Sequence, residues 1–313
     1  MRFKRVNDLT IVMYHYVRNI KESKYPRIKG LETSGFIRQL DYLVDSFNIV
    51  KAEDVIDCVK QGKQLPEHSC LLTFDDGYKD HVTNVLPELL KRNIQGSFFP
   101  LVNSVVDRDL LDVNKIHFIL ASTDNYSKLV RDVDSLCIEH GITPSELSSY
   151  KVQYAIPSYY DIADVMYIKH VLQHVLTEDI RNTITSKLFQ IYVNKAEIDL
   201  ADELYLSFDE TKTLVDNGMY VGGHGCRHLW LDKETVESQS LEIDNSLKFL
   251  KDVGSRTEDW IMCYSYGAYN SDTLGILKDR RCVVGLTTKI GVAKISQDSG
   301  LELPRYDTNH FPQ

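Results

Sequence analysis

The chain has 313 residues, of which 43% are hydrophobic and 26% charged, so it allows one large domain or two ordinary ones and excludes intrinsic disorder. Its formal charge of −9 comes without a cluster of Lys or Arg, which argues against nucleic acid and anionic membrane surfaces as partners. We find no signal-peptide pattern and no apolar stretch near the about 20 residues of a membrane helix. We therefore expect a cytoplasmic protein whose six scattered cysteines are reduced.

The first hundred residues alternate between two patterns. Short apolar runs predict buried strands, and apolar residues at helical spacing predict helices between them. The predicted strands are 9–13, 48–50, 70–74 and 96–101, and the predicted helices are 36–47, 53–59 and 84–92. This alternation indicates an α/β fold with a parallel sheet.

Residues 103–205 carry helical periodicity and almost no strand pattern, so we expect a helical insertion or cap. The alternation resumes with Ser207 and Glu210, which have the spacing of a capping box at the start of a helix. Strands are then predicted at 219–222, 260–264 and 282–287, with helices at 234–250 and 273–281. The expected domains are an α/β domain of residues 1–102 and 206–313, and the insertion of residues 103–205.

The sequence TFDDG at 73–77 ends a predicted buried strand. Side chains alternate along a strand, so Asp75 and Asp76 point in different directions. One carboxylate can then bind a metal while its neighbour handles protons. Taken alone, Asp-Asp-Gly is also good turn chemistry.

Two histidines, His224 and His228, follow another predicted strand in the sequence HGCRH. Two imidazoles and one carboxylate, with positions left open for water and substrate, are typical of a catalytic metal site. The glycines around the pair favour a loop or tight turn over a helix. The alternative is two unrelated surface histidines.

These motifs resemble those of the polysaccharide deacetylases, the carbohydrate esterase family four with the NodB homology domain. TFDDG looks like the first motif, and His224 and His228 look like its metal-binding pair, although Gly225 stands where Ser or Thr is usual. CYSYGAYN at 263–270 resembles a third motif in which an Arg and a Pro precede a Tyr. The resemblance covers residues 9–102 and 206–311 and leaves out the helical insertion.

The third motif departs from the family because Cys263 replaces the Arg that helps to hold the catalytic Asp, and Ser265 replaces the Pro. That function must come from elsewhere, and Arg305 is our candidate. Tyr14-His15 looks like the N-terminal Tyr-His segment of the exopolysaccharide deacetylase subgroup, in which the motif order is permuted. His15 would then be the general acid, with His310 as the competitor.

The resemblance implies a distorted (β/α)7 barrel with its site at the carboxyl ends of the strands. It implies that Asp76, His224 and His228 hold a divalent metal, with Zn²⁺ expected ahead of Ni²⁺, Co²⁺, Mn²⁺ or Fe²⁺, which lowers the pKa of its bound water towards about 7. Asp75 would be the general base, and a backbone N–H near Tyr266 would help to hold the oxyanion.

The expected activity is a metal-dependent N-deacetylase that hydrolyses the acetamide of an N-acetylated amino sugar in surface-glycan or polysaccharide biosynthesis. The same motifs also fit a hydrolase of another amide, cyclic ureide or imide bond. A sugar-binding pseudoenzyme is the third alternative, although an intact Asp75 and complete ligands argue against it. The sequence leaves open the sugar, its carrier and the oligomeric state.

Overall fold

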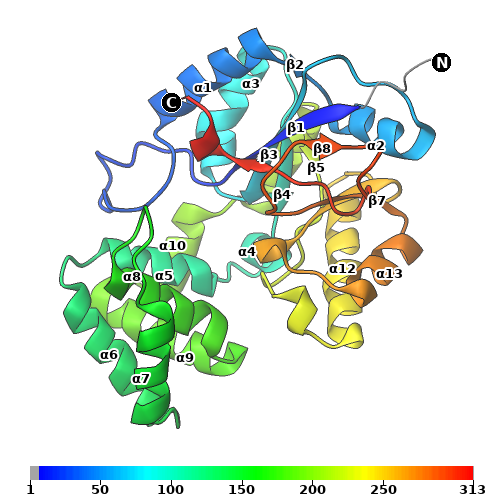
Figure 1. The fold of residues 1–313 in the computed structure, drawn as a ribbon. Coiled ribbons are helices and arrows are strands. Elements are labelled where there is room, and N and C mark those ends of the chain that lie inside the picture. Colours follow the sequence, from blue (N-terminus) through cyan, green and yellow to red (C-terminus); the bar gives the residue numbers. More distant parts are fainter. Residues whose placement is uncertain (1–6, 313) are drawn as a thin grey trace. The chain divides into compact units, whose positions relative to one another are not determined.

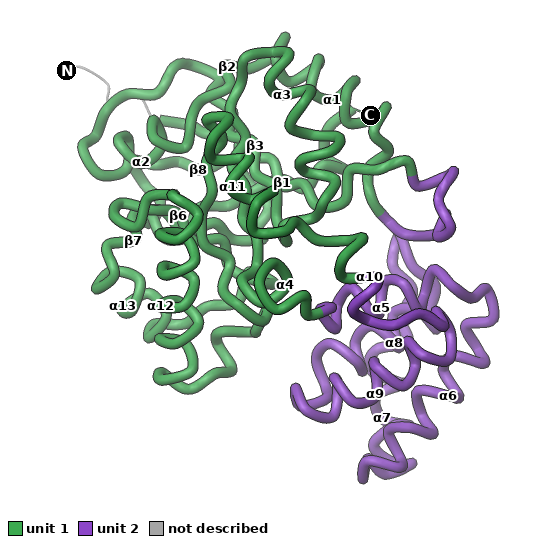
Figure 2. The backbone as a smooth tube through the Cα atoms, turned by 180° about the vertical axis from the view of Figure 1, so that it is seen from behind, with its two compact units in different colours: residues 1–19, 30–109, 201–313 green, residues 20–29, 110–200 purple. Residues whose placement is uncertain are grey.

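The computed structural model describes residues 7–312. The chain divides into two compact units, shown in different colours in Figure 2. We call them the α/β unit, made of residues 1–19, 30–109 and 201–313, and the helical unit, made of residues 20–29 and 110–200. Residues 110–200 of the helical unit lie within the expected 103–205 insertion. The unit also includes residues 20–29, which come earlier in the chain.

A seven-stranded sheet forms the centre of the α/β unit (Figure 1), with the path β5-β4-β3-β1-β8 and with β2 and β9 paired to β3 and β1. All its pairs are parallel except β1 with β8, so the sheet is mixed rather than purely parallel. The strands are β1 (Asp8–Tyr14), β2 (Asn48–Ile49), β3 (Ser69–Asp76), β4 (Ser97–Pro100), β5 (Tyr220–Val221), β8 (Ala293–Lys294) and β9 (Tyr306–Asp307).

Two further strands, β6 (Trp260–Cys263) and β7 (Cys282–Leu286), form a separate parallel pair. Isolated bridges join Gly223 to Met262 and Leu286 to Leu303, beside these strands. The α/β fold is therefore observed, while a closed barrel of about seven strands stays a prediction.

Strand β3 lies at the middle of this sheet and all eight of its residues are buried. Its side chains alternate between two hydrophobic clusters: Phe74 packs with Val12 in one, and Leu71 packs with Ile11 in the other. Burial on both faces explains why β3 is a continuous apolar run before its two aspartates. Parallel pairing with β1 and β4 brings the carboxyl ends of the three strands to one edge of the sheet.

Helices of the α/β unit begin close to the predicted positions. The predicted capping box is confirmed, because Ser207 Oγ accepts from the Glu210 N–H and Glu210 Oε2 accepts from the Ser207 N–H at 2.8 Å. The helices are α1 (Thr33–Ser46), α2 (Ala52–Gln61), α3 (Leu86–Lys91), α4 (Val102–Val106), α11 (Phe208–Asp216), α12 (Val236–Asp252) and α13 (Ser271–Asp279). A π-helical turn, His81–Val85, leads into α3.

The helical unit contains helices and no strand in residues 110–200, all of which the structure describes. Inside it, Lys115 is only 2% exposed and its Nζ lies 2.9 Å from Glu197 Oε2. The helices are α5 (Asp112–Ala121), α6 (Tyr126–Glu139), α7 (Pro144–Tyr154), α8 (Ala163–His170), α9 (Glu178–Tyr192) and α10 (Glu197–Leu204), the last of which crosses the boundary between the units. Across residues 7–312, no helix has the length and apolarity that a membrane span requires.

Candidate active site

The end of β3 carries two aspartates into a tight turn. Asp76 and Gly77 have φ of 70° and 69°, in the left-handed region that few non-glycine residues adopt. A Cβ on Gly77 would lie 2.6 Å from Pro100 Cβ, so only glycine fits between this turn and β4. The turn gives the two neighbouring carboxylates different surroundings.

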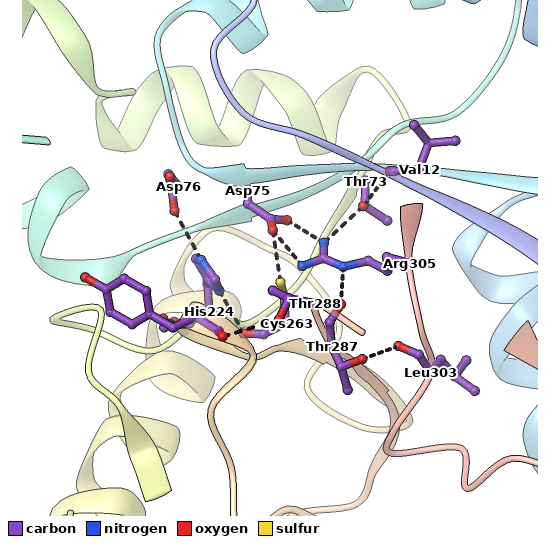
Figure 3. A network of polar contacts seen from close by, with 12 residues as sticks. Val12, Thr73, Asp75, Asp76, His224, Cys263, Thr287, Thr288, Leu303 and Arg305 are labelled. Atoms are coloured by element: carbon purple, nitrogen blue, oxygen red, sulfur yellow. Dashed lines mark hydrogen bonds and ion pairs between the residues drawn. The ribbon is translucent and has the colours of Figure 1, made fainter. Parts of the chain in front are cut away.

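Asp75 is held by the guanidinium of Arg305 (Figure 3). Arg305 Nη1 donates to Asp75 Oδ1 at 2.9 Å, and Nη2 lies 2.8 Å from Oδ2. The thiol of Cys263 adds a longer contact to Oδ2 at 3.3 Å. Arg305 is itself fixed, because its Nη1 also reaches Thr73 Oγ1 and its Nε donates to the carbonyl of Thr287.

This ion pair is almost completely buried, with Asp75 2% and Arg305 1% exposed. Burial acts to raise the pKa of Asp75, but the charges of Arg305 and His224 outweigh it, so the pKa lies below its usual range. Asp75 is therefore ionised at neutral pH. Its carboxylate can accept a proton there, and Arg305 fixes the direction in which it faces.

Asp76, His224 and His228 form a compact cluster in which one ligand atom from each lies within 4.8 Å of the others. His224 Nε2 lies 3.2 Å and His228 Nε2 3.5 Å from the same oxygen, Asp76 Oδ1. The second oxygen, Oδ2, accepts a hydrogen bond from the hydroxyl of Tyr78 at 2.7 Å. Tyr78 was not among the residues picked from the sequence, although it follows TFDDG directly.

The hydrogen bonding of this cluster suits a cation. The carbonyl of Cys263 accepts from His224 Nδ1 at 2.7 Å, and Nε2 on the other side of the ring faces Asp76. Cys263 and the Asp76 carboxylate outweigh burial and hold the pKa of His224 well above its usual range, so without a metal the ring is protonated and Nε2 donates to Asp76. Burial lowers the pKa of His228 to about 3, so this imidazole is neutral at neutral pH. A divalent metal held between these atoms would replace the proton on His224 Nε2 and face the lone pair of His228 Nε2 and the Asp76 carboxylate. Two imidazoles and a carboxylate are a ligand set for divalent metals such as zinc.

Aromatic rings lie beside the second histidine. The ring of Tyr266 meets that of His228 at a centroid distance of 4.2 Å and stacks on Trp230 at 4.3 Å. Tyr266 and His228 both have a φ of 58°, so both have a left-handed backbone conformation. Non-glycine residues with this backbone conformation are concentrated at functional sites.

His15 follows β1 directly, and since Tyr14 pairs with Phe74, His15 and Asp75 come next at the same edge of the sheet. The ring of a second histidine, His81, donates from Nε2 to the His15 carbonyl at 3.0 Å.

The other candidate acid, His310, is exposed, and its Nδ1 donates to the carbonyl of Asp307 in its own turn at 3.1 Å. No contact between His310 and Asp75, Asp76, His224 or His228 is found within residues 7–312. The roles of His15, His310 and Tyr266 in a reaction stay predictions.

The family model for polysaccharide deacetylases matches residues 175–282, less than half of the chain. This range includes both His224 and His228 but neither aspartate. No curated protein matches the sequence significantly.

Solved structures cover nearly the whole chain. The deacetylase PplD of Streptococcus pyogenes, in complex with acetate, has a TM-score of 0.59 and 16% identity over 96% of this chain and 92% of that one. The fold is that of the polysaccharide deacetylase structures. IcaB of Ammonifex degensii has a TM-score of 0.53 and 17% identity over 95% and 87%, and a de-N-acetylase of Aggregatibacter actinomycetemcomitans 0.53 and 15% over 95% and 94%. The family model thus matches a segment of about a third of the chain, and these structures show that the whole chain has their fold.

Proposed function

We propose that the protein is a metal-dependent N-deacetylase that hydrolyses the acetamide of an N-acetylated amino sugar. The observation that carries the proposal is the convergence of His224 Nε2 and His228 Nε2 on one oxygen of Asp76, beside a second aspartate held by an arginine. A divalent metal bound by these three residues would supply Lewis-acid chemistry and a water of lowered pKa.

Asp75 is the general base of this proposal. One ligand atom of Asp75 lies within 4.8 Å of one of His224, and Asp75 is the neighbour of Asp76 in the chain, so its carboxylate lies close to the three ligands. Arg305 binds both carboxylate oxygens and keeps Asp75 ionised and oriented to take a proton from water.

His15 is the general acid, and a backbone N–H near Tyr266 helps to hold the oxyanion. His suits the role of acid because its pKa lies near neutral pH, and expulsion of an amine needs a proton. The pairing of Tyr14 with Phe74 supports this role, because the residues that follow them are His15 and Asp75.

Acetate release tests the function. The purified protein is supplied with Zn²⁺ and assayed against N-acetylhexosamine oligomers, nucleotide-linked and lipid-linked N-acetyl sugars, and cyclic ureides and imides. Release of acetate from an N-acetyl sugar, abolished by a chelator and restored by metal, is the expected result. Turnover of ureides or imides alone would contradict the proposal.

A further inference from the structure

The loop that joins His224 to His228 has no regular secondary structure, so its shape depends on what its backbone contacts. It is nevertheless largely buried: His224 is 2% and Cys226 4% exposed. Buried backbone groups need hydrogen-bond partners. The partners of this loop therefore decide how precisely the two imidazoles are placed.

Glu242, on α12, supplies the acceptors for the loop. Its Oε2 accepts from the N–H of Cys226 at 2.7 Å and from the N–H of Arg227 at 3.2 Å, while its Oε1 accepts from Arg227 Nε at 2.9 Å. The side chain is only 4% exposed. A buried carboxylate that receives two consecutive backbone N–H groups fixes the path of the chain between them.

The opposite side of the loop is bound by the start of α4. The N–H groups of Val102 and Asn103 donate to the carbonyls of Gly225 and Cys226, both at 3.2 Å. Two helices therefore bind the backbone of residues 225–227: α12 accepts from its N–H groups, and α4 donates to its carbonyls. The α12 contact is made by a side chain, that of Glu242, and the α4 contacts are made by backbone N–H groups.

Gly225, which departs from the family pattern, lies next to the Glu242 carboxylate. The resemblance places Ser or Thr at this position, where the glycine removes a hydroxyl. Gly225 has a φ of +83°, and a Cβ there would lie 3.1 Å from Glu242 Oε2. The carboxylate of Glu242 and a glycine therefore fit together at this point of the loop.

We propose that Glu242 is the positioning residue of the metal site: it holds the His224–His228 loop through the N–H groups of Cys226 and Arg227, so that both Nε2 atoms face Asp76. This inference rests on the proposed function, since it concerns the same site. Partners of this kind around metal ligands are worth about 10–100-fold in metal affinity.

Two substitutions separate the reach of Glu242 from its charge. Glu242→Asp keeps the charge but is one methylene too short, whereas Glu242→Gln keeps the length and an oxygen that accepts from both N–H groups. Glu237→Asp, at an exposed position of the same helix, is the matched control. Two quantities are measured: hydrogen exchange of the 224–228 amides in metal-free protein, and Zn²⁺ affinity by competition with a chromophoric chelator.

We expect faster exchange in the loop and about 10–100-fold weaker Zn²⁺ binding for Glu242→Asp. Values close to wild type are expected for Glu242→Gln and Glu237→Asp. Wild-type exchange and affinity in Glu242→Asp would overturn the inference about Glu242 alone. Equal losses in Glu242→Asp and Glu242→Gln would overturn the positioning role, and a wild-type protein that binds no Zn²⁺ would overturn the proposed function together with this inference.

Discussion

Asp75 and Asp76 are adjacent in the chain, but their carboxylates have different partners. Asp75 is bound by Arg305, and Asp76 faces His224 and His228. Burial acts to raise the pKa of each carboxyl, but the charge of Arg305 outweighs it at Asp75 and the hydrogen bond from His224 outweighs it at Asp76, so both pKa values are lowered. The two residues are therefore both ionised but suited to different roles.

Asp75→Asn should keep the metal and lose turnover. The amide cannot accept a proton, and removal of a positioned general base lowers the rate by about 10²–10⁴-fold. Acetate release and metal content are measured on the same preparation. A variant that is metal-free but retains the wild-type rate on added metal would show that the two aspartates have the opposite roles.

His15→Ala should bind metal normally and lose rate on an amide substrate. The loss should be much smaller on an activated aryl ester, because that leaving group departs without a proton. His310→Ala is the matched control, since His310 is exposed and bonded within its own turn. An equal loss on both substrates, or a loss confined to His310→Ala, would contradict the assignment of His15 as the acid.

At the scale of elements, the turn at the end of β3 positions the carboxylates of Asp75 and Asp76. Gly77 lies against β4, and the added Cβ would be 2.6 Å from Pro100 Cβ and 2.9 Å from its Cα. The backbone of Pro100 cannot move without disturbing the β3–β4 pairing. This position therefore requires glycine for two reasons: its φ is positive, and there is no space for a Cβ next to Pro100.

Gly77→Ala should lower the free energy of unfolding by about 2–5 kcal/mol, the sum of a left-handed backbone penalty and overpacking. Gly62→Ala is the control, since Gly62 also has a φ of +69° but nothing lies within 4 Å of its added Cβ. It should cost about 1–2 kcal/mol. Chemical denaturation of both variants measures the difference, and equal losses would contradict the close packing against Pro100.

The elements that local patterns specify were predicted well. The apolar run before Asp75 predicts β3, and the Ser207–Glu210 spacing predicts the start of α11, because each signal lies within a few residues. Residues 20–29 form neither helix nor strand, so nothing in their pattern predicts that they join the helical unit. Their contacts, such as Arg27 Nε to the carbonyl of Ala121 at 3.2 Å, are long-range.

In the candidate site, too, the residues in local motifs were predicted and those that depend on long-range contacts were not. The motifs are local and identify the aspartates and histidines, whereas Tyr78, His81 and Glu242 were missed because their roles depend on side-chain direction. The Arg305–Asp75 pair spans 230 residues and was reached only through the family resemblance. The additional strands β8 and β9 are two residues each, too short for a periodic pattern.

For the whole molecule, His81 makes stability depend on pH. It is completely buried, and burial lowers its pKa from 6.5 to about 4. Between these values the unfolded chain binds a proton that the folded protein does not. Its contribution is therefore complete above pH 6.5 and is lost as the pH falls towards 4.

The free energy of unfolding of the metal-free protein should accordingly fall between pH 6.5 and pH 4. In His81→Gln this fall should be smaller by about 3 kcal/mol, which is 2.5 pH units at 1.36 kcal/mol each. Urea denaturation at a series of pH values measures both proteins. The same pH dependence in wild type and variant would show that His81 titrates normally in the folded state.

The metal content of wild-type protein and His228→Ala tests the central claim most directly. His68→Ala, at an exposed position before β3, is the control. After loading with Zn²⁺ and removal of excess metal, elemental analysis should find one metal ion per chain in wild type and His68→Ala. It should find essentially none in His228→Ala, because the site then lacks one of its three ligands. Stoichiometric metal retained in His228→Ala would contradict a site made by Asp76, His224 and His228.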